Sequence, residues 1–255
     1  MRVQFKSREY FKEFVRDRYE AIESQNRVLS LGEVREDRIP WVIQGEFRFC
    51  RQIIWAKYSM GESIENLVED YQQALGYMYQ SWMALSRKAY KNGVYFNHYF
   101  GGYYDEMLEI LSLGVLLHQS KETFITLAKI IDKDEVKDML YEFILDTQIK
   151  RSPLVEESYT ILQNMPREFK NLRMAVQEEN KVKTAKLIDK YFTKDWIKRV
   201  YKEGGNFDIS TDTGYCGYWN FYVAAISYLL DIDVSSFENN EYFPRDMYYY
   251  AKNHK

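Results

Sequence analysis

Apolar residues recur every three or four positions along most of the chain, which is the spacing of one face of an α-helix. Sustained alternation of apolar and polar positions, which marks a half-buried strand, is absent, and we read no Gly-Asn hairpin turn. The sequence therefore predicts an all-α protein, a bundle of roughly eight to ten helices in two packed helical halves. The stretches with helical spacing are residues 11–29, 64–85, 107–118, 124–131, 136–149, 172–176, 182–192 and 218–230.

Turn-forming residues separate these stretches. Leu31-Gly32 and Arg38-Ile39-Pro40 divide the first helix from the second, and residues 91–102 are expected to form an aromatic-rich loop. Residues 151–166 are bracketed by prolines and are expected to hold a short helix at the hinge between the halves. The longest polar loop is expected over residues 204–217.

The length of 255 residues suits one large domain or two small ones. We expect an N-terminal helical region over residues 1–130 and a C-terminal helical region over residues 131–255. Hydrophobic residues make up 46% of the chain and charged residues 29%, an ordinary globular balance. Neither a secretory signal nor a run long enough to cross a membrane is recognisable, so we expect a cytoplasmic protein whose two cysteines are reduced.

Charge is distributed in blocks of opposite sign. Residues 1–100 carry a net charge of +2, residues 101–150 of −5, residues 151–202 of +5 and residues 203–255 of −5. The total of −3 is too close to neutral to indicate direct nucleic-acid binding. Either sign of block could form a surface that faces a partner, although the solvated faces of amphipathic helices are the more common cause of such a block.

The motifs of common enzymes are missing. No histidine follows a glutamate at the Glu-x-x-His spacing of a di-iron bundle, and no cysteine or histidine cluster suits zinc. A phosphate loop and a Gly-x-Ser-x-Gly elbow are also missing. His118 fits a core or boundary position, and the Glu-x-Lys triplets at residues 135–137 and 179–181 fall in helical patterns rather than on the strand that a nuclease needs. We expect no catalytic residue, no metal and no cofactor.

The stretch from Tyr218 to Leu230 is apolar on nearly every helical face, which is typical of a buried central helix. Asp231-Ile232-Asp233 ends it, and Ser235-x-x-Glu238 has the spacing of a capping box. Pro244 suits the first turn of a last helix, with Asp246 close to the positive end of its dipole.

These residues also carry a resemblance to a known family. Residues 217–221 (GYWNF), 229–237 (LLDIDVSSF) and 242–247 (YFPRDM) resemble the C-terminal signature of the PoNi immunity proteins. Residues 57–62 (KYSMGE) and Asp195-Trp196 are similar to further family features, so the resemblance spans most of the chain. The residues that match the C-terminal signature are Gly217, Tyr218, Trp219, Phe221, Asp231, Asp233, Ser235, Ser236, Pro244 and Asp246.

The chain departs from the family pattern at two positions. Tyr222 stands where the family usually has Glu, and Val234 replaces the second acid of the usual Asp-Asp pair. The missing acids weaken a binding role for those two positions, whereas the apolar spacing and the turn that indicate the fold are intact.

The resemblance implies a cytoplasmic, non-enzymatic immunity protein that neutralises a cognate PoNe-type DNase toxin. Such toxins are delivered between competing bacteria and resemble metal-dependent nucleases with basic DNA clefts. An acidic surface would complement such a cleft and speed association. We expect the toxin-binding surface to include acidic residues from two blocks: Asp105, Glu106, Glu109, Asp208, Asp212, Glu238 and Glu241.

Two other interpretations stay open at this point. A helical scaffold or adaptor with an unrelated protein partner would use the same tyrosine-rich surfaces, since 23 tyrosines lie in the chain. An unrecognised enzyme would reveal itself by a pocket that holds His118 beside several carboxylates. The abundant aromatic residues also leave a homodimer open, while a membrane partner is not expected.

Overall fold

The computed structural model describes residues 1–151, 169–198 and 212–254. The chain divides into two compact units, which are described separately. Unit 1 holds Met1–Ser86 and the described part of the segment Phe207–Tyr218, and unit 2 holds the described parts of Arg87–Asn206 and Trp219–Lys255. The compact units change at residue 86, whereas the sequence suggested two helical regions that meet at residue 130. The division at residue 130 stays a prediction about regions of the sequence.

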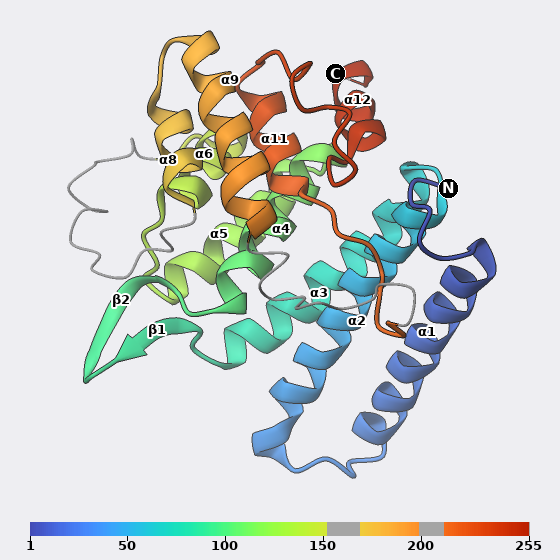
Figure 1. Cartoon of the computed structure of the whole chain (residues 1–255). Coiled ribbons are helices and arrows are strands. Elements are labelled where there is room, and N and C mark those ends of the chain that lie inside the picture. The colour runs from blue at the N-terminus through green and yellow to red at the C-terminus, as the bar shows by residue number, and fades with distance from the viewer. Residues whose placement is uncertain (152–168, 199–211, 255) are drawn as a thin grey trace. The chain divides into compact units, whose positions relative to one another are not determined.

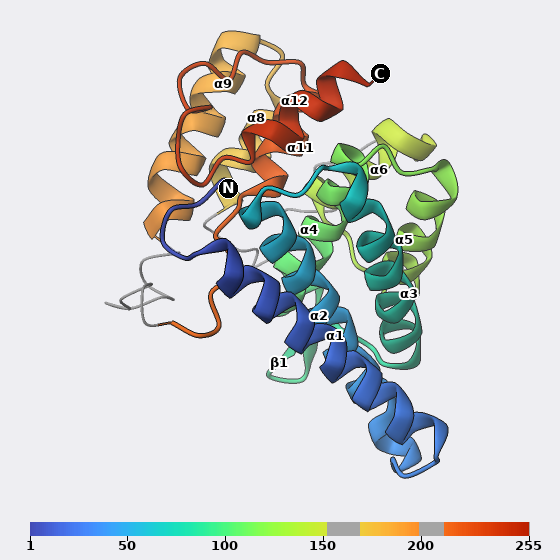
Figure 2. The same ribbon diagram turned by 90° about the vertical axis from the view of Figure 1, so that its right-hand side faces the viewer.

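Unit 1 is built from three long helices. These are α1 (Arg8–Ser30), α2 (Ile39–Met60) and α3 (Val68–Ala84), with 3₁₀ turns η1 (Glu36–Arg38) and η2 (Glu65–Leu67) before α2 and α3. Helix α2 packs against both α1 and α3, and the three rods lie side by side in Figures 1 and 2. Fully buried Phe11, Phe47 and Trp82 contribute one large ring from each helix to the core.

Sequence signals explain where these helices begin and end. The hydroxyl of Ser7 accepts a hydrogen bond from the backbone N–H of Tyr10 (3.1 Å) and caps α1. Pro40 lies in the first turn of α2, and Gly61 ends that helix in a left-handed conformation (φ 91°) that favours glycine. The break predicted between residues 31 and 40 is thus confirmed.

Unit 2 holds the remaining described elements. They are β1 (Lys88–Lys91), β2 (Val94–Tyr99), α4 (Gly102–Leu116), α5 (Lys121–Lys133), α6 (Met139–Ile149), α8 (Lys170–Gln177), α9 (Lys181–Lys190), the π-helical turn η4 (Tyr191–Trp196), α11 (Phe221–Leu229) and α12 (Arg245–Asn253). Helix α4 packs against α11, α6, α5 and α12 and forms the centre of this unit. The prediction of a mostly helical, multi-helix protein is confirmed.

Helix α11 is the buried central helix expected from the stretch 218–230. Every residue from Phe221 to Ser227 is buried. Asn220 caps its first turn through a hydrogen bond from the backbone N–H of Val223 to Oδ1 (2.9 Å). Asp231 follows the helix with a left-handed φ of 47°, which ends the helical path.

A β-hairpin replaces the loop predicted for residues 91–102. Strands β1 and β2 pair antiparallel, with Lys91 opposite Val94. Asn92 (φ 52°) and Gly93 (φ 80°) supply the two left-handed residues of the turn, as a two-residue hairpin loop of the Asn-Gly type requires. The all-helical prediction was wrong here because this turn signal was not read.

Two local predictions about caps and motifs were also wrong. Ser235 and Glu238 do not form a capping box. The backbone N–H and the hydroxyl of Ser235 donate instead to the carboxylate of Asp233, both at 2.9 Å. The Glu-x-Lys triplet at 135–137 lies in the connection between α5 and α6, and the one at 179–181 ends at the first residue of α9, so neither lies inside a helix. The predicted short helix and hinge at 151–166, and most of the predicted loop at 204–217, lie outside the described residues.

Buried polar groups tie α4 to α6 in unit 2. The carboxylate of Asp138 caps α6 by accepting from the backbone N–H of Leu140 (2.9 Å) and also accepts from the Tyr104 hydroxyl (3.0 Å). The Tyr141 hydroxyl donates to the backbone carbonyl of Tyr104 (2.9 Å). Burial raises the pKa of Asp138, and these donors oppose that shift because they favour the charged carboxylate.

Candidate functional site

The acidic residues expected on α4 are drawn into the interior. Asp105 is half-buried, whereas Glu106 is only 5% exposed and Glu109 only 3%. The cause is the all-round apolar sequence of α4, whose residues from Tyr104 to Leu116 are buried with the exception of Asp105. A carboxylate on such a helix is carried inward with its neighbours, so Glu106 and Glu109 are not presented on the surface.

Asp212 has a local structural role in unit 1. Its Oδ1 accepts from the backbone N–H of Gly214 (2.8 Å), which forms a small turn. The Tyr10 hydroxyl donates to the backbone carbonyls of Thr213 (3.0 Å) and Tyr215 (2.9 Å) and so holds the segment 212–215 on α1. Burial, with Asp212 as the second cause, raises the pKa of Tyr10 to about 12. Asp208 lies outside the described residues.

Glu238 and Glu241 lie between α11 and α12 in unit 2. The side chain of Glu238 is 16% exposed, accepts a hydrogen bond from the Tyr249 hydroxyl and lies 3.9 Å from the guanidinium of Arg245. Glu241 is exposed. The exposed ring of Tyr249 lies beside them and was not predicted from the sequence. Tyr249 falls on the polar face of α12, and this position in the helical pattern could have indicated its exposure.

These residues and their exposed acidic neighbours make the last described part of the chain acidic. Residues 231–254 hold five carboxylates against one arginine and one lysine. Asp231 pairs with Lys181 (2.9 Å), while Asp233, Glu241 and Asp246 are exposed. We name Asp233, Glu238, Glu241, Asp246 and Tyr249 the C-terminal acidic surface.

The residues that match the C-terminal family signature are mainly structural. Gly217 adopts a φ of 119°, a conformation that residues with a side chain rarely adopt. Trp219 and Phe221 are buried. Pro244 is the N-cap residue of α12 and not part of its first turn, where it was expected, whereas Asp246 lies in that turn, as predicted. Tyr218 is half-buried and Ser236 is exposed.

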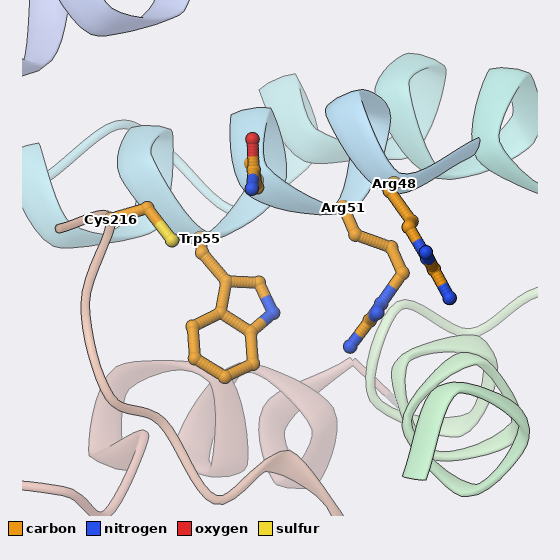
Figure 3. A pocket seen from close by; sticks show the side chains of 5 residues that line it. Arg48, Arg51, Trp55 and Cys216 are labelled. Atoms are coloured by element: carbon orange, nitrogen blue, oxygen red, sulfur yellow. The ribbon is translucent and has the colours of Figure 1, made fainter. Parts of the chain in front are cut away.

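A pocket in unit 1 lies on one face of α2. Figure 3 shows Arg48, Arg51 and Trp55 projecting from α2 to the same side, with Cys216 beside them. The pocket has a volume of about 220 Å³ and is also lined by Gln52, whose side-chain oxygen accepts from Arg18 Nε (2.6 Å). Spacings of three and four residues place the arginines and the tryptophan on one helical face. Guanidinium groups beside an indole suit a planar anion, not acid–base chemistry.

Across residues 1–151, 169–198 and 212–254, no three His, Cys, Asp or Glu side chains form a group that could hold a metal ion. His118 is exposed at the end of α4, and its Nε2 lies 3.1 Å from the backbone carbonyl of Ala251. Both cysteines are free thiols; burial raises the pKa of Cys50 to about 12, so it stays protonated and unreactive.

No helix among the described residues has both the length and the apolar character needed to cross a lipid bilayer.

Comparison with known proteins gives two family matches. Residues 2–129 match the model described as PoNe immunity protein (PoNi), N-terminal, and residues 136–247 match PoNe immunity proteins (PoNi), C-terminal. No curated protein matches the chain. A solved structure, "The Crystal Structure of Protein PA2201 from Pseudomonas aeruginosa", has a similar fold: TM-score 0.63 and 14% identity over 95% of this chain and 88% of that one. At this identity the likeness concerns the fold alone.

The fold and the family matches together define a mostly helical protein of the immunity class. Both family models match in the expected order and cover nearly the whole chain. The chain therefore belongs to the family of PoNe immunity proteins (PoNi).

Proposed function

We propose that this chain acts in the cytoplasm as a non-enzymatic inhibitor that binds and neutralises a cognate PoNe-type DNase toxin. The observation that carries the proposal is the pair of family matches over residues 2–129 and 136–247. A family of immunity proteins acts by binding, and the described residues offer exposed charge and aromatic rings for that purpose.

The C-terminal acidic surface is proposed to face the toxin. A nuclease must attract the phosphates of DNA, so its DNA-binding surface carries positive charge. Exposed Asp233, Glu241 and Asp246 would compete with phosphate for that surface, and their field would speed the encounter. Tyr249 would add an aromatic contact at the edge of the charged region.

Among the residues expected from the sequence, Glu238 and Glu241 belong to this proposed surface. Asp105 and Asp212 are half-buried, and a part for them in toxin binding stays a prediction. The burial of Glu106 and Glu109 removes them from the proposed contact.

The test is a charge reversal with a matched control. E241K/D246K should weaken binding to an inactive form of the toxin encoded beside this gene by at least ~10-fold, mostly through slower association. It should also reduce protection of cells that express the active toxin. The control E23K/E69K changes two exposed acids in unit 1, one of which, Glu69, lies in the first turn of α3 as Asp246 lies in that of α12.

Equal loss of binding in both variants would remove the C-terminal acidic surface from the proposal. If the wild-type chain does not bind the toxin at all, the proposed function itself is wrong.

A further inference from the structure

A row of lysines follows the exposed side of α9 and the helical residues after it. The chain is helical from residue 181 through 198, first as α9, then as the π-helical turn η4, and then as α-helix again. All five lysine side chains are exposed. We name the following set the lysine row: Lys183, Lys186, Lys190, Lys194 and Lys198.

The local helix geometry keeps the lysine row in line. Its members are spaced by three, four, four and four residues. Because an α-helix has 3.6 residues per turn, side chains four residues apart shift slightly around the helix at each step. The π-helical turn at Tyr191–Trp196 has more residues per turn and reduces this shift. The opposite side of the same segment carries Ile188, Phe192 and Trp196 into the core. The row therefore forms one edge roughly 20 Å long.

None of the five ammonium groups has an ion-pair partner within the described ranges. Lys181, which begins α9, is the neighbour that pairs, with Asp231 (2.9 Å). Asp195 accepts from Asn171 of α8 (2.5 Å), and Asp189 is half-buried.

Positive charges three and four residues apart on a helix repel each other and destabilise the helix. The four successive pairs of the lysine row are therefore unfavourable. Asp189 and Asp195, which lie three residues from Lys186 and Lys198, are half-buried and offset only part of this repulsion. An exposed row of like charge that is not fully offset is typical of a surface that meets a partner.

We propose that the lysine row binds the phosphate backbone of duplex DNA. Lysine is a point charge well suited to phosphate, whereas protein interfaces are depleted in lysine and rich in arginine and aromatic residues. The aromatic residues of this segment, Tyr191, Phe192 and Trp196, are buried, so single-stranded bases find no ring to stack on. An exposed helix edge fits the wide major groove of B-form DNA, but not the deep, narrow one of duplex RNA.

The binding is expected to be weak and independent of sequence. The lysine row holds no planar side chain such as arginine, asparagine or glutamine, and a flexible point charge suits the phosphates of any sequence. Non-specific contacts of this kind have dissociation constants of roughly 10⁻⁴ to 10⁻⁶ M at physiological salt. The whole-chain charge of −3 conceals the row, because acidic blocks on both sides in sequence cancel it. This binding goes beyond the proposed toxin inhibition and does not depend on it.

The experiment measures fluorescence anisotropy of a 20-base-pair duplex DNA with the full chain at several salt concentrations. The wild-type affinity should fall steeply with salt, and K186Q/K190Q/K194Q should reduce the slope of log K against log salt by about 2 to 3. The control K12Q/K129Q/K137Q removes three exposed lysines elsewhere and should leave the slope nearly unchanged. Circular dichroism on all three chains shows that folding is intact.

Several results would overturn the proposal. They are no binding of the duplex by wild type at ~20 mM salt, an equal loss of slope in the control variant, and tighter binding of single-stranded DNA or duplex RNA than of duplex DNA. Binding of a polyglutamate probe at an affinity equal to that for the duplex would also contradict it, because it would indicate an acidic protein partner.

Discussion

Glu46 is a carboxyl group placed in the core of unit 1. It lies on α2 with none of its surface exposed, and neither carboxylate oxygen has a hydrogen-bond partner among the described residues. Burial raises its pKa from 4.5 to about 7. Because the folded chain holds the proton more tightly than the unfolded chain, this group contributes full stability below about pH 4.5. That contribution is lost as the pH rises through 7.

We predict that Glu46→Gln makes unit 1 less sensitive to pH. The amide has the same shape and stays neutral, so the variant should be more stable than wild type by about 2–3 kcal/mol at pH 8 and nearly equal at pH 4.5. Urea unfolding at both pH values measures the difference. Glu23→Gln, at an exposed position on α1, is the control and should show little change at either pH; an identical response of the two variants would contradict the assignment.

Lys57, Asp70 and Tyr19 form a second polar group in unit 1 and join all three helices. Lys57 Nζ lies 2.7 Å from Asp70 Oδ2 and donates to the Tyr19 hydroxyl (2.8 Å), which donates to the other oxygen of Asp70. The side chain of Asp70 is 4% exposed and that of Lys57 is 20% exposed. Removing one charge leaves the other buried without its partner, which is costly.

We predict that Asp70→Leu destabilises the chain by about 3 kcal/mol, whereas the double variant K57M/D70L recovers most of that loss. A double-mutant cycle of urea unfolding, with Lys57→Met as the fourth corner, gives the coupling. Additive losses in the double variant would mean that the pair does not stabilise unit 1 as a pair.

At the scale of elements, the start of α11 explains why its signature is structural. Asn220 is fully buried and caps the helix through its side-chain oxygen. Its backbone N–H donates to the carbonyl of Tyr242 (3.0 Å) and so joins the helix start to the segment before α12. One residue therefore positions both elements that flank the C-terminal acidic surface.

We predict that Asn220→Ala costs about 1–2 kcal/mol and that Asn220→Ser restores most of it, because serine is an equally good cap residue. Urea unfolding and hydrogen exchange of the α11 amides are the measurements. Ser7→Ala removes the exposed cap of α1, where water can replace the hydroxyl, and should cost less. If alanine and serine at position 220 behave alike, the cap is not what holds α11.

The long helices could be predicted from the sequence because each buries one apolar stripe with the 3.6-residue period. The hairpin could not be predicted from alternation, because Tyr90, Val94 and Tyr95 are exposed apolar residues that blur the pattern. Its Asn92-Gly93 turn was the readable signal.

The candidate site was harder to predict than the fold. Acidic residues were expected to be exposed because they are charged. Glu106 and Glu109, however, belong to a helix that is buried on nearly every side. The lysine row was visible in the sequence as a basic block, yet its alignment on one edge depends on the π turn, which has no recognised sequence signal.

At the scale of the whole molecule, the near-neutral charge of −3 results from segregated blocks. In unit 2 the C-terminal acidic surface and the lysine row are defined by different elements and carry opposite charge. The two proposals assign them to different partners, a basic protein surface and a phosphate backbone. Charge changes in one surface should therefore leave the other interaction largely intact.

The most direct test of the central claim is a titration of the cognate toxin's DNA cleavage with this chain. K186Q/K190Q/K194Q is included beside wild type so that coating of the DNA is separated from inhibition of the toxin. The account predicts that both chains abolish cleavage at about one equivalent of toxin and that neither chain cleaves DNA alone. Undiminished cleavage in the presence of a large excess of either chain would contradict the account.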